Sequence, residues 1–333
     1  MTKVKVLQSI DYDMQIYEMT SERVRVVMTN VGCHLLSIFT PDREGKMADI
    51  LLGYQEITHG MDDGQYLGAL CGRVAGRIAG ASFRLNDKTY QLSVNEGENH
   101  LHGGASGFDK KIFSTEILPN GIRFSYISED GEEGYPGRLK LQAEYILRDN
   151  ILYTNFVATT DEDTIVNIAG HPYFNLSGGT EEIYTHELKI DANEIACIDS
   201  KHLPTGEYIN VEGTPFDFHE YHEIKENLAK PHPQLALPGG FDHAFMLGSG
   251  FEQIALRHRL SGRMVEIMTN LPCAVIYTGN PKGIAIETQY LPDSIHIEEE
   301  SQVILRSNQE YHARTAYCFE VMQEEVEEDW KIH

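Results

Sequence analysis

The chain has 333 residues, and 41% of them are hydrophobic, so it can bury a core of ordinary size. Its 27 Lys and Arg residues against 51 Asp and Glu residues give a formal net charge of −24, which argues against nucleic acids and anionic membrane surfaces as partners. Five scattered cysteines without a C-x-x-C pair, an N-terminus without a long apolar run, and the absence of any stretch of roughly 20 apolar residues predict a soluble, cytoplasmic protein.

Alternation of apolar and polar residues, which is typical of half-buried strands, recurs along most of the chain. Its first clear examples are residues 24–28 and 35–39, on either side of an interruption at Val31-Gly32. Residues 82–92 predict a hairpin that turns at Asn86-Asp87, a pair that tolerates positive φ. The same pattern predicts further strands at residues 121–128, 139–147, 151–159, 164–169, 274–278, 303–306 and 311–321, and a hairpin over 257–268 that turns at Ser261-Gly262.

Helical periodicity is scarce in this sequence. Residues 221–230 predict one short helix, and the acidic run 323–329 predicts a solvated tail. Neither a low-complexity linker nor a repeat of fixed period divides the chain, so we expect one domain over residues 1–333. The predicted fold class is all-β, a large antiparallel sandwich or barrel. An exposed sheet edge could pair two copies, so the pattern leaves monomer and homodimer open.

One histidine stands at the end of a predicted strand. The apolar run 164–169 leads to His171, and Pro172 withholds a backbone donor and biases His171 toward an extended conformation. The unperturbed pKa of histidine, about 6.5, suits such a residue to proton transfer near neutral pH. Tyr173 follows as amphipathic bulk, and Ser-Gly-Gly at 177–179 then ends the pattern. A packed histidine that bonds a carbonyl group is the alternative.

Glycine recurs at every fourth position between Gly68 and Gly80, and Arg73 and Arg77 lie within this segment. The pattern indicates tight backbone turns that expose one or both arginines. An arginine beside such a loop can clamp an anion or donate hydrogen bonds to sugar hydroxyls, and a surface ion pair is the competing interpretation.

His100 and His102 are the best candidates for metal ligands. Two residues apart on an extended segment, they would point the same way, as in metal-binding barrels of the cupin type. Such sites need a carboxylate a few residues further on, but Gly103-Gly104 follow and the next acid is Asp109. We therefore predict no metal and expect His102 to form hydrogen bonds within a pocket.

Two carboxylates stand out in the second half of the chain. Asp242 lies between a glycine turn and an apolar run, where it can accept hydrogen bonds from vicinal hydroxyls or cap the turn. Glu287 ends the apolar run that starts at residue 283, so partial burial is expected to raise its pKa toward neutrality, as a general base requires. A structural carboxylate paired with an arginine is the competing account.

Five ordered motifs resemble those of the aldose 1-epimerase (galactose mutarotase) family. They are Gly76-Arg77, Leu101-His-Gly-Gly104, His171-Pro-Tyr-Phe-Asn-Leu176, Phe241-Asp-His243 and Ile286-Glu-Thr-Gln-x-x-Pro-Asp293, together with the shorter matches Gly134-Tyr-Pro-Gly137 and Tyr277-Thr-Gly-Asn280. The resemblance runs from about residue 68 to residue 293. It implies the large antiparallel β-sandwich of that family, in agreement with the strand pattern.

The resemblance further implies that the chain interconverts the α and β anomers of a free aldohexose such as galactose or glucose. Ring opening removes the proton of the anomeric hydroxyl while the ring oxygen receives one, so a carboxylate and an imidazolium suffice, without a cofactor or metal. The site residues that the resemblance implies are the general acid His171, the general base Glu287, Tyr173 beside the acid, and the sugar contacts Arg77, His102 and Asp242.

Two residues depart from the family pattern and leave the preferred sugar open. Gly76 stands where relatives commonly have Asn, and Val275 stands where some have a substrate-contacting Gln. Two other functions also remain: an epimerase of hexose 6-phosphates and a carbohydrate-binding protein without catalysis. The first needs several basic residues around the pocket, and only Arg77 and Arg73 are available.

Overall fold

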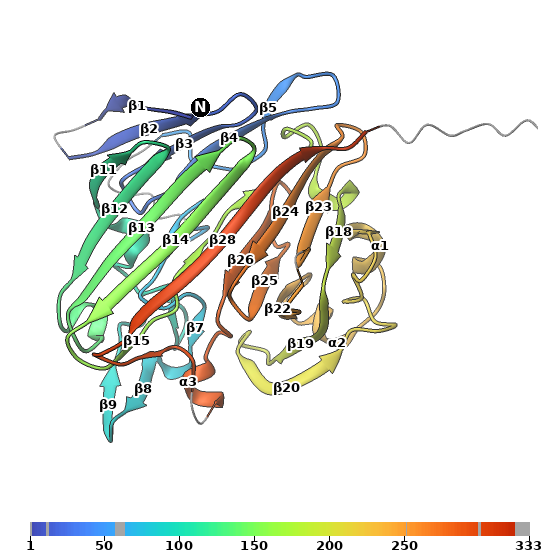
Figure 1. Ribbon diagram of the computed structural model, residues 1–333. Coiled ribbons are helices and arrows are strands. Elements are labelled where there is room, and N and C mark those ends of the chain that lie inside the picture. Colours follow the sequence, from blue (N-terminus) through green and yellow to red (C-terminus); the bar gives the residue numbers. More distant parts are fainter. Residues whose placement is uncertain (1, 11–12, 57–63, 251, 299–300, 324–333) are drawn as a thin grey trace, which may run out of the picture.

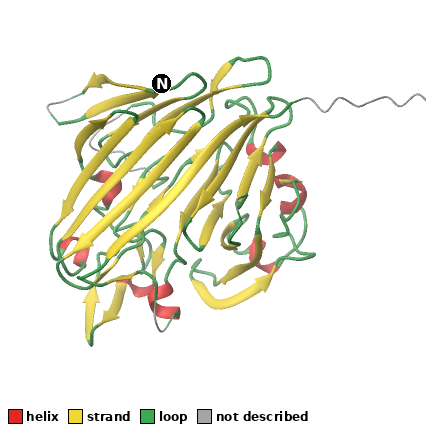
Figure 2. Ribbon diagram, viewed as in Figure 1, coloured by secondary structure: helices red, strands yellow, loops and turns green. Residues whose placement is uncertain are grey.

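The computed structural model describes residues 2–10, 13–56, 64–250, 252–298 and 301–323, and strands dominate it (Figures 1 and 2). Its largest sheet is antiparallel throughout and has nine strands. Their order is β11 (Ser114–Leu118), β12 (Gly121–Ser128), β13 (Leu139–Arg148), β14 (Ile151–Thr160), β28 (Glu310–Val321), β24 (Arg263–Thr269), β23 (Ile254–Arg257), β18 (Glu187–Ile190) and β21 (His222–Glu223).

A six-stranded antiparallel sheet lies behind the nine-stranded sheet in Figure 1. Its order is β17 (Tyr173–Phe174), β26 (Ile284–Gln289), β25 (Cys273–Tyr277), β22 (Asp242–Leu247), β19 (Ala192–Ile198) and β20 (Pro204–Asn210). Ile286 of β26 and Phe156 of β14 belong to one buried cluster, and the Thr288 and Thr315 hydroxyls share a hydrogen bond of 2.7 Å between the sheets. The two sheets therefore pack face to face, and the predicted antiparallel β-sandwich is confirmed.

A third sheet crosses one end of this sandwich, at the top of Figure 1. Its order is β1 (Lys3–Ser9), β2 (Gln15–Thr20), β3 (Arg25–Thr29), β4 (Leu35–Pro41) and β5 (Met47–Asp49). Four short pairs complete the strands: β6 (Leu70–Cys71) with β16 (Ala169–Gly170), β7 (Arg77–Ile78) with β10 (His100–Leu101), β8 (Ser82–Leu85) with β9 (Lys88–Gln91), and β15 (Thr164–Ile165) with β27 (Ile304–Leu305).

Helices are few and short. The α-helices of the described residues are α1 (Ile224–Leu228), α2 (Pro233–Ala236) and α3 (Ser294–Ile297), and single 3-10 turns span Ala79–Ala81, Phe108–Lys110, Glu132–Gly134 and Ile183–Thr185. None of the helices in the described ranges has the length and apolar character that crossing a bilayer demands.

The local predictions agree with the structure better than the non-local ones. The hairpin at 82–92 is present, and Asn86 and Asp87 adopt φ values of +49° and +61°. The predicted helix at 221–230 shortens to α1, because residues 222–223 pair with β18 as strand β21. The strands that were not predicted include β1, β2, β11, β18, β19, β20 and β22 and the short strands β5, β6, β7, β10, β17 and β21. The acidic run from residue 324 onward lies outside the described residues.

The predicted strand 164–169 is wrong as one continuous element. It divides into β15 and β16, because the three residues between them bond to different segments. The Val166 N–H donates to Val303 O, the Asn167 N–H to Arg73 O, and the Ile168 N–H to the Tyr311 hydroxyl. The chain therefore leaves one sheet pair and joins another just before His171.

Candidate active site

Strand β26 is buried along its whole length, and its two faces do different work. Ile286 belongs to the main core and Thr288 bonds Thr315, so these side chains face the nine-stranded sheet. Because side chains alternate along a strand, Glu287 and Gln289 point the other way, into a pocket. Glu287 lies two residues before the end of the strand, within the ladder rather than at its end as predicted.

His171 directly follows β16, as the sequence predicted. Its N–H donates to Ala69 O at 2.9 Å, in line with the β16–β6 pair. Pro172 then leads the chain into β17, and its carbonyl accepts a hydrogen bond of 3.4 Å from the Ile286 N–H. That contact holds the two segments together at the position where β26 carries Glu287, so the imidazole and the carboxylate meet.

The Nε2 atom of His171 lies 3.2 Å from Oε1 of Glu287, and the two side chains are only 5% and 4% exposed. Burial lowers the pKa of His171 to about 4. Burial also raises the pKa of Glu287 to about 8, with help from the charge of Asp242 and opposition from Arg77. Burial disfavours charge on both groups, whereas their contact favours an ion pair, and both arrangements hold one proton. The two groups therefore titrate as a coupled pair.

His102 has a fixed orientation in the same pocket. It follows β10 and has a φ of +50°. Its ring Nδ1 accepts a hydrogen bond of 3.2 Å from the Gly76 N–H, and its backbone N–H donates to Gly76 O at 3.1 Å. Burial and then the positive charge of neighbouring His171 and Arg77 lower its pKa well below the usual range. A neutral ring whose Nδ1 is an acceptor carries its proton on Nε2, so His102 is a donor.

Arg77 and Asp242 lie side by side on the pocket wall. Arg77 Nη1 is 3.7 Å from Asp242 Oδ2, and Nη2 is 3.3 Å from Glu96 Oε1. His202 also approaches Asp242, with Nδ1 at 3.0 Å from Oδ2. Guanidinium donors beside carboxylate acceptors match the needs of vicinal hydroxyls, which both donate and accept. The surface ion pair considered for Arg77 is thus an ion pair within the pocket.

Two tyrosine rings stack against the His171 imidazole. The ring centroids of Tyr173 and Tyr66 lie 4.9 Å and 6.2 Å from that of His171, at interplanar angles of 28° and 26°. Tyr66 also packs 4.6 Å from the ring of His102. Stacked rings restrict rotation of the imidazole and keep water from its faces. Among these contacts, Tyr66 was missed by the sequence analysis, because it lies in a loop without any periodic pattern.

The pocket that these residues enclose has a volume of about 360 Å³, which lies in the range of small-molecule sites. All six predicted site residues line it: Arg77, His102, His171, Tyr173, Asp242 and Glu287. At its mouth, Asn280 donates a hydrogen bond of 2.9 Å to Gln65. Tyr277, which pairs with Asp242 across β25 and β22, contributes another wall.

A metal site was predicted to be absent, and the donor geometry bears on that prediction. Ligand atoms of His102, His171 and Glu287 lie within 4.8 Å of one another. However, a metal at Nε2 of His102 would need the proton on Nδ1, where the Gly76 N–H already points. The arrangement of these three groups therefore suits proton transfer and hydrogen bonding better than ligation.

His100 and Arg73, the other candidates from the sequence, lie elsewhere. His100 bonds Ser93 O through Nδ1 and the Tyr135 hydroxyl through Nε2, so it does not point into the pocket with His102. The expectation that the two histidines share a direction is wrong, because His102 has left the extended conformation. Arg73 is 2% exposed and not a surface residue; it donates to the carbonyls of Pro136 and Gly137 and to Ser128.

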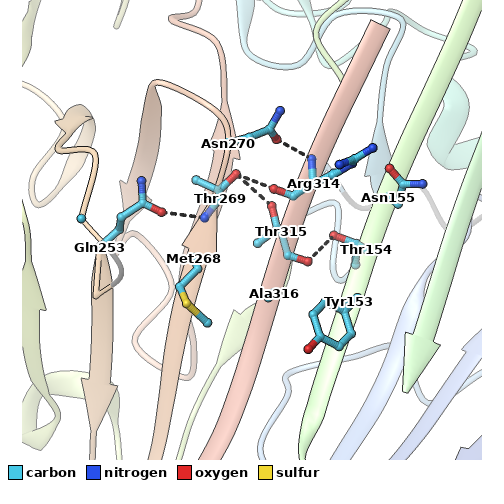
Figure 3. A pocket seen from close by; sticks show the side chains of 11 residues that line it. Tyr153, Thr154, Asn155, Gln253, Met268, Thr269, Asn270, Arg314, Thr315 and Ala316 are labelled. Atoms are coloured by element: carbon cyan, nitrogen blue, oxygen red, sulfur yellow. Dashed lines mark hydrogen bonds between the residues drawn. The ribbon is translucent and has the colours of Figure 1, made fainter. Parts of the chain in front are cut away.

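A second space, of about 450 Å³, lies over β14, β28 and β24 (Figure 3). Its hydrogen bonds are used within the sheet: Gln253 accepts from the Thr269 N–H, and Asn270 accepts from the Arg314 N–H. Apart from Arg314, its side chains are neutral. It offers no acid and base in contact, so it is not the candidate for proton chemistry.

Comparison with known proteins points to one family. The family model of aldose 1-epimerase matches residues 15–318. The chain is 38% identical to the galactose mutarotase of Bos taurus, covering 92% of this chain and 94% of that protein, and 33% identical to the aldose 1-epimerase of Escherichia coli K12, covering 88% and 91%. The crystal structure of galactose 1-epimerase from Lactobacillus acidophilus NCFM is 26% identical, with a TM-score of 0.84 over 97% of this chain and 99% of that one.

These similarities extend over nearly the whole chain, and the residues that the family model matches include the segments that carry His171 and Glu287. The chain therefore belongs to the aldose 1-epimerase family and is an isomerase that acts on carbohydrates.

Proposed function

We propose that Glu287 is the general base and His171 the general acid in the interconversion of α and β anomers of a free aldohexose such as galactose or glucose. The observation that carries this proposal is the 3.2 Å contact between His171 Nε2 and Glu287 Oε1 inside a buried pocket. The ring oxygen and the anomeric hydroxyl are bonded to the same carbon. Two groups that touch each other can therefore reach both oxygen atoms of one sugar.

The reaction requires one proton on the pair. Glu287 removes the proton of the anomeric hydroxyl, and His171 protonates the ring oxygen, so the C1–O5 bond breaks and a carbonyl forms at C1. The pair then consists of a neutral imidazole and a protonated carboxyl, the state that burial favours. After rotation about C1–C2, the same two groups act in reverse and close the ring on the other carbonyl face.

The neighbouring groups hold the sugar while this happens. His102 donates through Nε2, Arg77 donates from its guanidinium, and Asp242 accepts. Tyr173 stacks on the acid. We propose that these side chains bind the hydroxyls that do not react, which fixes the anomeric carbon against Glu287.

Polarimetry of freshly dissolved α-galactose tests the assignment. We expect Glu287→Gln and His171→Asn to lower kcat by about 10²- to 10⁴-fold, the usual contribution of one positioned acid or base. Glu116→Gln is the control, because Glu116 is 61% exposed on edge strand β11. If wild type binds galactose without accelerating its mutarotation, the protein is a binding module; if Glu287→Gln remains fully active, the base is another residue.

An epimerase of hexose 6-phosphates is supported less well. Among the described residues that line the pocket, Arg77 is the one Lys or Arg, and it faces Asp242 and Glu96. A phosphate dianion would meet these carboxylates, so the described pocket favours a neutral sugar.

A further inference from the structure

Beside Glu287 lies a small cavity of about 50 Å³ that the reaction described above does not use. It adjoins the sugar pocket along Arg77, His102, Asp242 and Glu287, which line both spaces. Because the cavity lies beside the proposed base, a substituent of the sugar that enters it would affect which sugars the enzyme accepts.

The register of the six-stranded sheet explains why this cavity exists. Glu287 pairs with Val275 across β26 and β25, and Val275 pairs with Ala244 across β25 and β22. Paired residues have their side chains on the same face of a sheet, so these three form one row, and Ala196 of β19 packs at its far end. Because Val275, Ala244 and Ala196 have small side chains, the surface next to the carboxylate is hollow.

The walls of the cavity are firm. Gly76 roofs it with a φ of +77°, and a Cβ at this position would lie 2.7 Å from Pro292 Cβ, so no side chain can fill the space from that side. Gln289 is held by hydrogen bonds with Glu287 and Asn167. Val275, Ala244 and Ala196 thus form an apolar floor on one side of the space. Polar side chains line much of the rest: Arg77, His102, His202, Asp242, Glu287 and Gln289.

The two proposed catalytic groups decide which sugar carbon faces this cavity. His171 stacks on Tyr173 of β17, and Glu287 lies on the next strand, β26. The proposed roles of these two groups therefore direct the ring oxygen toward β17 and C1 toward β26. In a pyranose, C2 is bonded to C1 on the side opposite the ring oxygen. With these proposed roles, we expect C2 to lie toward β25 and β22, near Val275 and Ala244.

We propose that this cavity is a subsite for the acyl group of 2-acetamido-2-deoxyhexoses, so that the enzyme also interconverts the anomers of N-acetylated amino sugars. The inference rests on the proposed function, because His171 and Glu287 orient the sugar. An acetamido group extends three heavy atoms beyond the atom bonded to C2. At roughly 15 Å³ for each water-sized group, the cavity accepts about three of them. The alanine and valine side chains suit the methyl group.

The test compares galactose with 2-acetamido-2-deoxygalactose, each as the freshly dissolved α anomer, by polarimetry against the spontaneous rate. For wild type we expect kcat/KM values for the two sugars within about tenfold of each other. Ala244→Leu places three more carbons in the cavity and is expected to lower the ratio of acetamido sugar to galactose at least tenfold. Because an inactive fraction of a less stable variant lowers both rates equally, it does not change this ratio. Ala196→Leu fills the same cavity from β19 and is expected to lower the ratio in the same way.

Ala316→Leu is the matched control, since Ala316 lies on β28 beside the distant space of Figure 3 and is expected to leave the ratio unchanged. Acceleration with galactose but not with the acetamido sugar would overturn this inference and leave the proposed function intact. An equal loss on both sugars in Ala244→Leu would also overturn it. Failure of wild type with every sugar would reject the proposed function itself.

Discussion

At the residue scale, the coupled pair of His171 and Glu287 gives the reaction a defined pH range. The pair holds one proton between a pKa of about 4 for His171 and about 8 for Glu287, both set mainly by burial. Below the lower value a second proton removes the base, and above the higher value loss of the last proton removes the acid. We expect a bell-shaped profile of kcat/KM with limbs near pH 4 and pH 8, each falling about tenfold per pH unit. A flat profile from pH 5 to pH 10 would contradict the pairing.

The same burial predicts a stability cost at the proposed base. The folded-state pKa of Glu287, about 8, lies above the unfolded value of about 4.5, so its contribution to stability is complete below pH 4.5 and is lost as the pH rises toward 8. Glutamine stays neutral and lacks this dependence. At pH 8.5 we therefore expect urea denaturation to give Glu287→Gln a free energy of unfolding on the order of 2 kcal/mol higher than that of wild type. At pH 4.5 the two free energies of unfolding should be similar. Glu116→Gln, which removes a carboxylate whose side chain is 61% exposed, is the control variant.

At the element scale, the loop that carries Gly76 orients His102. The N–H of Gly76 fixes the orientation of the His102 ring. Gly76 has a φ of +77°, and a Cβ added to it would lie 2.7 Å from the Cβ of Pro292, so this position excludes a side chain. Gly97 has a φ of +56° with no atom within 4 Å of a built Cβ, so it is a matched comparison. Both Gly→Ala changes should cost about 1 kcal/mol for the left-handed backbone. Gly76→Ala should cost an additional 1–3 kcal/mol, roughly the range for overpacking, and raise the KM for galactose.

Urea denaturation of the two variants together with their kinetics measures these effects. Equal losses of stability and an unchanged KM in Gly76→Ala would mean that the loop can move away from Pro292, and that His102 does not depend on it.

Elements governed by local sequence were predictable, and those governed by distant partners were not. The 86–87 turn needs only residues that tolerate positive φ, and the structure has it. The segment 166–168 reads as strand but bonds to three separate parts of the chain, which no local pattern encodes. Strand β19 is buried at positions of both parities and β1 is exposed along nearly its whole length, so neither alternates.

The candidate site divides in the same way. His171 and Glu287 were identifiable because each is a titratable residue in or beside an apolar strand pattern, and the family motifs include both. Tyr66 carries no such pattern, and its position against two histidines depends on the fold. The cavity beside Glu287 follows from strand register, which the sequence alone does not fix.

At the scale of the whole molecule, the described sheets share one core. Val26 of β3, Phe156 of β14 and Ile286 of β26 belong to the same buried cluster. We propose that residues 1–333 form one domain, and expect a single thermal transition by circular dichroism with equal calorimetric and van't Hoff enthalpies. Two separated transitions would show that one of the sheets unfolds independently.

The net charge of −24 also has a consequence for substrate choice. The protein and the carboxylates of its pocket repel anions. The inhibition constant of galactose 6-phosphate for galactose mutarotation should therefore be at least tenfold higher than the KM for galactose. Added salt should narrow that difference. Inhibition by the phosphate at concentrations below the KM for galactose would instead favour the sugar-phosphate epimerase.

Strand β26 joins two tasks in neighbouring residues, since Ile286 packs into the core while Glu287 faces the sugar pocket. A shift of one residue in the register of β26 would turn the Glu287 carboxylate into the hydrophobic core and turn Ile286 toward the substrate. Misregistered chains would thus be unstable and inactive at once. A cell that removes poorly folded copies would, by the same act, remove the copies that cannot turn over sugar, so the soluble pool should consist of competent enzyme.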